Sequence, residues 1–244
     1  MDSVGDARYA ALEFNAPMSS ARVRDLLASL GPLADALIVD LGCGWAEFLL
    51  RLLAAEPSAS GIGVDGDQAA IARARHNAEL RGLDDRLQLE CGDATDWSGR
   101  ADVAIVVGAS HAWGGTRATL NAVRSLLPRG GRLLLGEGFW EQPPTPGALA
   151  ALDAKPEDYT TLAGLVDCCL ECAYRPLAIA TATMDEWDAF ESGFCAGRER
   201  WLLKNPDAPS ADAVRAEIDR HRAGWLNGYR SILGFAYLTL VVPA

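Results

Sequence analysis

Apolar runs and amphipathic stretches alternate along the chain from about residue 20 to residue 180. Short apolar or alternating runs are typical of strands and occur at 36–41, 59–65, 85–93, 101–108, 131–139 and 174–183. Stretches with apolar residues three or four apart predict helices at 19–31, 46–56, 67–82, 116–131 and 159–173. The Pro-rich segment 141–158 interrupts this alternation and is predicted to be a loop.

This alternation predicts an α/β fold. Strands joined by helices of this length form right-handed crossovers, which give a mostly parallel, doubly wound sheet with helices on both faces. The last third differs, because two long helical patterns at 185–206 and 210–231 precede a final strand at 232–242. We therefore predict one domain over residues 1–244, with a helical cap at 184–230 inserted before the last strand.

Composition restricts the possible partners. The chain carries 33 acidic and 22 basic residues, a net charge of −11, which disfavours a nucleic-acid partner. No apolar run reaches the roughly 18 residues that span a bilayer, and the first residues lack the apolar core of a secretion signal. We expect a cytoplasmic protein without a membrane partner. The cysteines at 168–172 have no nearby histidine, so free thiols are favoured and no metal site is predicted.

The predicted strands end in acidic residues. In a doubly wound sheet, ligands lie beyond the carboxyl ends of the strands, and four of the first five ends carry an acid: Asp40, Asp65, Asp93 and Glu137. None carries Lys or Arg, which disfavours a triphosphate. The turn Gly42-Cys43-Gly44 lacks the third glycine of the dinucleotide motif, since Glu47 stands there. The pattern favours a ligand with a ribose, a base and a positive or zwitterionic tail.

Four segments in order carry a family resemblance. The sequences VDLGCG, GVDGD, ECGDATDW and LLPRGGRLLLGE resemble successive motifs of the class I S-adenosylmethionine-dependent methyltransferases. The resemblance implies strand order 3-2-1-4-5-7-6, S-adenosylmethionine as cofactor and S-adenosylhomocysteine as product. It places Asp40 toward the ammonium, Asp65 on the ribose hydroxyls and Asp93 on the adenine amino group, with the Ala94 amide donating to the ring. The other cofactor residues that we expect are Gly42, Cys43, Gly44, Gly66, Gln68, Gly92, Gly108 and Ser110.

Candidate acceptor residues follow the fourth and fifth strands. His111 is a candidate base, or a group that only shapes the pocket, and Trp113 could stack an aromatic acceptor. Glu137 could bind a cationic acceptor or take a proton, and it could equally hold Trp140 or a residue of the cap in place. Further candidates for binding the acceptor are Phe14, Asn15, Trp140, Trp187, Phe190 and Glu191. For Trp187, Phe190 and Glu191 the alternative is a small core of the insertion. His221 is expected to be solvated.

These observations predict methyl transfer from S-adenosylmethionine to nitrogen or oxygen of a small molecule, with a natural-product acceptor as the first hypothesis. Parts of the chain also resemble small bacterial methyltransferase-like proteins, which imply no particular substrate. Two alternatives remain at this point. One is a sensor or partner subunit that binds the cofactor without turnover, and the other is a nicotinamide-dependent oxidoreductase. The sequence leaves the acceptor and the oligomeric state open.

Overall fold

A computed structural model describes residues 4–243, which form two compact units. The sheet unit comprises residues 20–138, 163–181 and 235–243. The helical unit comprises residues 4–19, 139–162 and 182–234. Each unit combines segments that are distant in sequence, and the chain passes between them several times.

The sheet unit is built on seven strands in the order β3-β2-β1-β4-β5-β7-β6, which confirms the predicted order. The pairs β3–β2, β2–β1, β1–β4 and β4–β5 are parallel. Strand β6 pairs antiparallel with β7. The strands are β1 (Leu37–Leu41), β2 (Ser60–Asp65), β3 (Leu87–Cys91), β4 (Val103–Val107), β5 (Arg132–Trp140), β6 (Arg175–Thr181) and β7 (Leu233–Val241). The outer ends of β5 and β7 extend into the helical unit.

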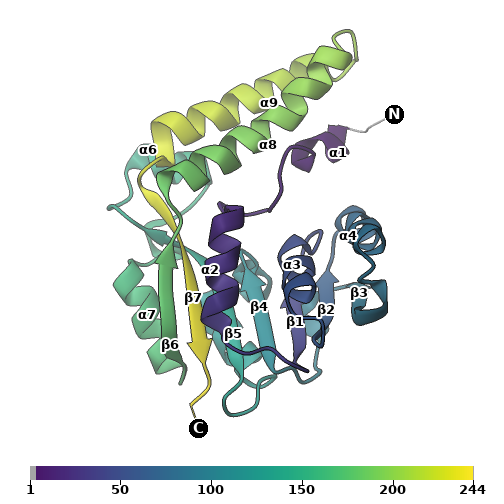
Figure 1. Ribbon diagram of the computed structural model, residues 1–244. Helices are drawn as coiled ribbons and strands as arrows, with labels where there is room; N and C mark the ends of the chain where they lie inside the picture. The colour runs from purple at the N-terminus through teal and green to yellow at the C-terminus, as the bar shows by residue number, and fades with distance from the viewer. Residues whose placement is uncertain (1–3, 244) are drawn as a thin grey trace. The chain divides into compact units, whose positions relative to one another are not determined.

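Helices cover this sheet, and Figure 1 shows α2 and α3 lying across one of its faces. The α-helices of the unit are α2 (Ser20–Leu30), α3 (Glu47–Ala55), α4 (Gln68–Arg81), α5 (Thr116–Arg124) and α7 (Leu162–Glu171). Three short 3-10 helices span Asp84–Arg86, Ala94–Asp96 and Ser110–Trp113. Leu49, Leu50, Leu52 and Leu53 of α3 are fully buried, so this short helix is apolar on most of its surface. Such burial is expected for a helix enclosed in a core.

The strand pairs on either side of β1 indicate where a ligand can bind. Asp40 on β1 lies in register with Gly63 on β2 and with Ile105 on β4. The chain leaves β1 toward β2 on one side, while β4 and β5 continue on the other. This reversal is the topological switch point at which open α/β sheets bind their ligands. The turn after β1 lies at that point.

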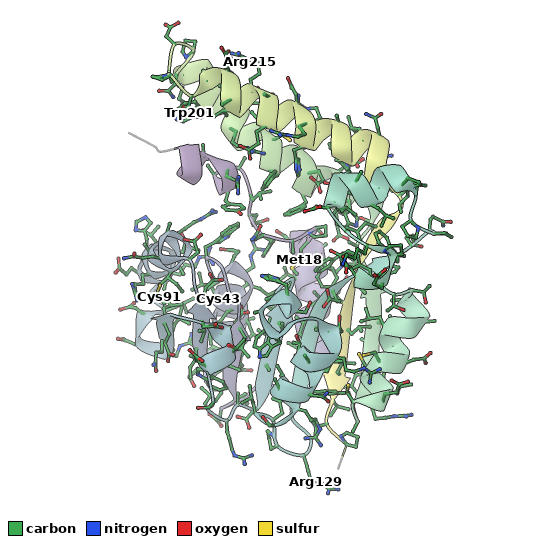
Figure 2. The ribbon with its side chains drawn as sticks, turned by 180° about the vertical axis from the view of Figure 1, so that it is seen from behind. Met18, Cys43, Cys91, Arg129, Trp201 and Arg215 are labelled. Carbon is green, nitrogen blue, oxygen red and sulfur yellow. The ribbon has the colours of Figure 1, made fainter. Side chains whose placement is uncertain are left out.

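The helical unit contains a long antiparallel helix pair, α8 (Met184–Lys204) and α9 (Ala211–Gly224), which lie side by side in Figure 1. The pair packs through an apolar cluster near its far end, where Trp201 is labelled in Figure 2. Thr183 begins α8 with a capping box, because its hydroxyl accepts the Glu186 N–H and the Glu186 carboxylate accepts the Thr183 N–H. The remaining elements are α1 (Val4–Tyr9), α6 (Pro146–Leu152), a 3-10 turn at Pro156–Asp158 and a π-helix at Trp225–Tyr229.

Three elements differ from the sequence-based prediction. The segment 141–158 was predicted to be a loop but contains α6, which the Thr145 side chain caps and Pro146 begins. Helix α1 was not predicted. The helix predicted to run to residue 231 ends at Gly224 and continues as the π-helix. A single domain with a cap at 184–230 stays a prediction. Among the described residues, no helix has the length and apolar character needed to cross a membrane.

Candidate cofactor site

The turn after β1 is held tightly against its neighbours. The N–H groups of Gly42 and Cys43 both donate to the carbonyl of Val64 on β2, at 2.8 and 3.0 Å. Gly42 has a φ of +79°, and a Cβ at this position would lie 2.4 Å from the Cβ of Ala109. Only glycine fits this conformation and this approach. The turn therefore lies close to the ends of both β2 and β4.

Asp65 ties the turn to the end of β2. Its Oδ2 accepts the Gly44 N–H at 2.7 Å, and its Oδ1 accepts the Asp67 N–H at 2.8 Å. The first bond fixes Gly44, and the second fixes the start of α4, whose N-cap is Asp67. Each carboxylate oxygen keeps acceptor capacity beyond these bonds. The sequence predicted that Asp65 faces the ligand, and the structure adds that Asp65 also orders the turn.

Asp40 is a buried acid that forms no ion pair with any residue that the structure describes. Its side chain is 4% exposed, and none of the described residues donates a hydrogen bond to it. Burial, and to a smaller extent the nearby Asp65 charge, raise the pKa of Asp40 to about 8. Burial and these two acids also raise the pKa of the Cys43 thiol, so it is not a reactive thiolate. A cationic ligand would relieve the cost of ionising Asp40.

Asp93 follows β3 and begins a 3-10 turn. Its Oδ1 accepts both the N–H and the hydroxyl of Thr95, at 2.8 and 2.7 Å. These bonds lower the pKa of Asp93, which keeps the exposed carboxylate ionised. Ala94 is buried beside it. A hollow lined by Asp93, Trp97 and Cys91 borders this end of β3, and Figure 2 labels Cys91 there.

The two candidate catalytic residues differ in exposure. His111 lies exposed on the 3-10 helix that follows β4, with half-buried Trp113 two residues on. Glu137 on β5 is 8% exposed, and both its oxygens accept hydrogen bonds, one from the Thr116 hydroxyl and one from the Gly138 N–H, each at 3.1 Å. The imidazole is thus the more accessible of the two groups.

The other predicted acceptor residues belong to the helical unit, where several form its core. Trp187 packs with Trp225, Tyr229 and Ala148. Glu191 is 3% exposed and accepts a hydrogen bond from the Tyr229 hydroxyl at 2.8 Å. Its other oxygen lies 2.6 Å from Nε2 of His221. The expectation that His221 is simply solvated was wrong, because its partner is 30 residues away in sequence and only the helix pair brings them together.

The remaining predicted members of this set are placed as follows. Phe14 is buried, whereas Asn15 is exposed. The ring of Phe190 contacts that of Trp187 edge to face. Trp140 is buried at the end of β5, where its indole N–H donates to the carbonyl of Pro156 and its ring contacts Tyr159. These contacts are those of packed side chains, and acceptor binding by these residues stays a prediction.

Three arginines that the sequence did not predict to belong to the site lie near the glycine turn. The carboxylate of Glu47 accepts from Arg51 at 2.8 Å and from Arg81 at 2.7 Å, so its charge is compensated. Glu47, which stands at the third-glycine position of the dinucleotide motif, therefore adds little net negative charge beside the turn. The guanidinium of Arg73 lies over the ring of Trp45, 4.1 Å from the ring centroid. Arg73 belongs to the middle of α4, so it does not follow from the pattern of the strand ends.

These residues fit S-adenosylmethionine. Its ammonium could form an ion pair with the buried carboxylate of Asp40. Its ribose hydroxyls could donate hydrogen bonds to the carboxylate oxygens of Asp65. The described residues hold no group of His, Cys, Asp and Glu side chains suited to a metal ion. All six cysteines are free thiols. The fold and the acids at the switch point are those expected of an α/β protein that binds a nucleoside with a cationic or zwitterionic tail.

Comparison with known proteins identifies the family. Residues 39–133 match the model of a methyltransferase domain. The YjhP protein of Escherichia coli is 30% identical over 208 residues, which are 84% of each chain. A methyltransferase of Geobacter sulfurreducens, solved with S-adenosylhomocysteine, superposes with a TM-score of 0.91 at 28% identity, covering 98% of this chain and 97% of that one. One from Thiobacillus denitrificans, also with S-adenosylhomocysteine, gives 0.89 at 29% identity, covering 99% and 100%.

The chain belongs to the class I S-adenosylmethionine-dependent methyltransferases. It is an enzyme of this class, and S-adenosylmethionine is its cofactor. This result decides against the nicotinamide-dependent alternative and confirms the family, the fold and the cofactor expected from the sequence.

Proposed function

We propose that the enzyme transfers a methyl group from S-adenosylmethionine to nitrogen or oxygen of a small molecule, with a natural product as the leading class of acceptor. The observation that carries the site assignment is the buried, uncompensated Asp40 beside the turn that Asp65 anchors. The acceptor class rests on the net charge of −11, which opposes nucleic acid. We propose the cytoplasm as its location, since all six cysteines are free.

The proposed roles of the residues follow from their contacts. Asp40 binds the ammonium, directly or through water, while Gly42, Cys43 and Gly44 line the amino-acid tail. Asp65 accepts from the ribose hydroxyls. Oδ2 of Asp93, which has no bond among the described residues, accepts from the adenine amino group, and the Ala94 N–H donates to the ring. The other proposed cofactor contacts are Gly66 and Gln68 beside the adenine, and Gly92, Gly108 and Ser110 at the ends of β3 and β4.

The cofactor supplies a methyl group already activated on a sulfonium, so the protein mainly positions the acceptor and excludes water. An acceptor that is protonated at neutral pH also needs a base. We assign that role to the exposed imidazole of His111, with Trp113 as a wall of the acceptor pocket. Glu137 is the second candidate, but both its oxygens already accept hydrogen bonds.

Two measurements test this function. Calorimetric titration should give saturable binding of S-adenosylhomocysteine and none of NAD⁺. A panel of small phenols, amines and hydroxy acids, incubated with S-adenosylmethionine, should then reveal acceptors through release of S-adenosylhomocysteine. Binding without turnover, on a panel that a control methyltransferase uses, would count against the proposed class of acceptor. Methylation of RNA in preference to every small molecule would refute the acceptor class.

A further inference from the structure

The sheet unit has a second hollow at the amino ends of β1, β4 and β5, which is the opposite end of these strands from the glycine turn. Figure 2 labels Arg129 at this end of the sheet and Cys43 in the turn. The hollow has a volume of about 390 Å³, which is large enough for a small molecule. None of the residues that line it belongs to the proposed cofactor or acceptor sites.

Arg132, the first residue of β5, lines this hollow and has unused hydrogen-bonding capacity. Its Nη1 donates to the carbonyls of Leu30 and Pro32, the latter at 2.9 Å, which holds the guanidinium in place. Its Nε is buried without a partner among the described residues, and none of them accepts a hydrogen bond from Nη2. A buried N–H group without a partner calls for an explanation, and two N–H groups along one edge of a guanidinium can bind a carboxylate. The Nε–Nη2 edge of Arg132 is therefore suited to the carboxylate of a ligand.

Asp102 supplies a free acceptor beside this cation. Its backbone carbonyl accepts the Arg132 N–H at 3.0 Å, so the two residues are neighbours at the starts of β4 and β5. Oδ2 of its side chain accepts the Leu37 N–H at 2.9 Å, whereas Oδ1 has no hydrogen bond among the described residues. Partial burial lowers the pKa of Arg132, and the charge of Asp102 opposes this change, as expected for nearby opposite charges. Oδ1 is thus free to bind an ammonium group near the guanidinium.

The charges of the lining restrict the class of ligand. Two arginines, Arg129 and Arg132, and two acids, Asp35 and Asp102, line the hollow, so its formal charge is zero in a chain of net charge −11. Arg129 and Asp35 are exposed, and neither forms an ion pair with another described residue. A simple anion would be repelled by the two acids, and a simple cation by the two arginines. A small zwitterion is attracted by both pairs.

We propose that this hollow binds a free α-amino acid, with its carboxylate on Arg132 and its ammonium on Asp102. The other residues of the lining are proline, alanine and glycine, which favours an amino acid with an apolar side chain. The site is separate from the chemistry of methyl transfer, because it uses no residue assigned to the cofactor or the acceptor. It therefore stands or falls independently of the proposed function.

The test titrates the common protein L-amino acids, one at a time, into the full chain by calorimetry. Excess S-adenosylhomocysteine is present throughout, so that no amino acid can bind at the glycine turn in place of the cofactor's own tail. We expect at least one apolar amino acid to bind with a Kd of about 1 mM or lower. Its amide, which lacks the carboxylate, and its deaminated acid, which lacks the ammonium, should each bind at least about 10-fold more weakly.

Two variants assign the contacts. Arg132→Lys keeps the charge but not the planar guanidinium, and it should weaken both the amino acid and its deaminated acid by about 10-fold. Asp102→Asn keeps an oxygen for the Leu37 N–H but removes the charge, so it should weaken the amino acid by about 10-fold and leave the deaminated acid no weaker. Arg24→Ala, which removes an exposed arginine of α2 outside the hollow, is the control and should bind the amino acid as the wild type does.

The proposal is overturned if no amino acid gives saturable binding at concentrations up to about 10 mM. It is also overturned if the amide and the deaminated acid bind as tightly as the amino acid, or if both variants melt like the wild type and bind the amino acid unchanged. If Arg132→Lys fails to fold, Asp102→Asn decides alone, and unchanged affinity for the amino acid in that variant overturns the proposal.

Discussion

The amide of Gly44 donates to Oδ2 of Asp65 at 2.7 Å, which joins the glycine turn after β1 to the acidic end of β2. Gly44 has a φ of +54°. The Asp65 side chain, at the end of the next strand, holds its N–H in place. The residue proposed to bind the ribose therefore also shapes the surface that receives the amino-acid tail. The two halves of the cofactor site are not independent.

Asp65→Ala should consequently lose more than a ribose contact. It removes two acceptor oxygens from the ligand and leaves the Gly44 N–H without its partner, so we expect affinity for S-adenosylhomocysteine to fall by at least about 100-fold. Asp85→Ala, which removes an exposed acid before β3, is the control and should bind normally. Calorimetry measures both, and micromolar affinity retained by Asp65→Ala would refute the assignment.

Asp40 should make the stability of the free enzyme depend on pH. Its pKa of about 8 in the folded state exceeds the ordinary value of 3.8, so between these values the folded chain holds a proton that the unfolded chain has released. Raising the pH through this window therefore lowers the free energy of unfolding, by at most about 1.4 kcal/mol per pH unit. Urea unfolding from pH 5 to 8 should show a shallower decline in Asp40→Asn than in the wild type. Parallel curves would contradict the raised pKa.

The same group should couple cofactor binding to pH. A bound ammonium favours ionised Asp40, so binding releases a proton below about pH 8 and affinity should increase from pH 6 to 8. Calorimetry in buffers of different ionisation enthalpy detects this proton directly. Asp40→Asn should bind weakly and without the pH dependence.

Ala46 is held in a left-handed conformation, with a φ of +55°, immediately before α3. This conformation costs a non-glycine residue about 1–2 kcal/mol. Ala46→Gly should therefore leave stability unchanged or raise it by up to about 1 kcal/mol, after the larger entropy of unfolded glycine is included. Ala74→Gly, at a buried position within α4, should instead destabilise by roughly 1 kcal/mol. Chemical denaturation compares the pair, and an equal loss in both variants would argue against strain at Ala46.

Glu191 should matter for the stability of the helical unit. Glu191→Ala removes the hydrogen-bond partner of both Tyr229 and His221, which should cost roughly 2–4 kcal/mol of unfolding free energy. Glu199 forms a more exposed pair with Arg222, and Glu199→Ala should cost less than about 1 kcal/mol. Urea titrations followed by tryptophan fluorescence test the difference. If the two variants lose the same free energy of unfolding, the buried contacts of Glu191 stabilise this unit no more than an exposed ion pair does.

His111 should affect turnover more than cofactor binding. If its imidazole accepts a proton from the acceptor, His111→Ala should lower the rate of methyl transfer by about 100-fold or more, with affinity for S-adenosylhomocysteine nearly unchanged. His76→Ala, which removes an exposed imidazole from α4, is the control and should retain full activity. The rates are measured with an acceptor identified in the panel, and unchanged turnover in His111→Ala would remove it as a base.

The sheet unit and its acids could be predicted from the sequence because they depend on local order. Apolar runs specify buried strands, and the crossover rule then brings the carboxyl ends of β1 to β5 to one edge. Asp40, Asp65 and Asp93 follow directly from that rule. The motifs supplied the strand order and the cofactor, neither of which periodicity alone could have given.

The elements that were missed depend on contacts between distant residues. The segment of helix α6 was predicted to be a loop because it is rich in proline. A capping threonine followed by proline is, however, also a signal for the start of a helix. The π-helix at Trp225–Tyr229 contributes Trp225 and Tyr229 to a core with Ala148 of α6. No local pattern predicts such a contact.

The sequence by itself determined the fold class, the cofactor and the acidic ends of the strands, because each is written in a short run of neighbouring residues. Only the tertiary structure decided which partners these charged and aromatic side chains have. It showed that Glu47 is compensated by two arginines, that Glu191 is held by Tyr229 and His221, and that Arg73 lies on Trp45. Charges and aromatic rings interact over a few ångströms in space, and their partners come from helices that the sequence keeps tens of residues apart.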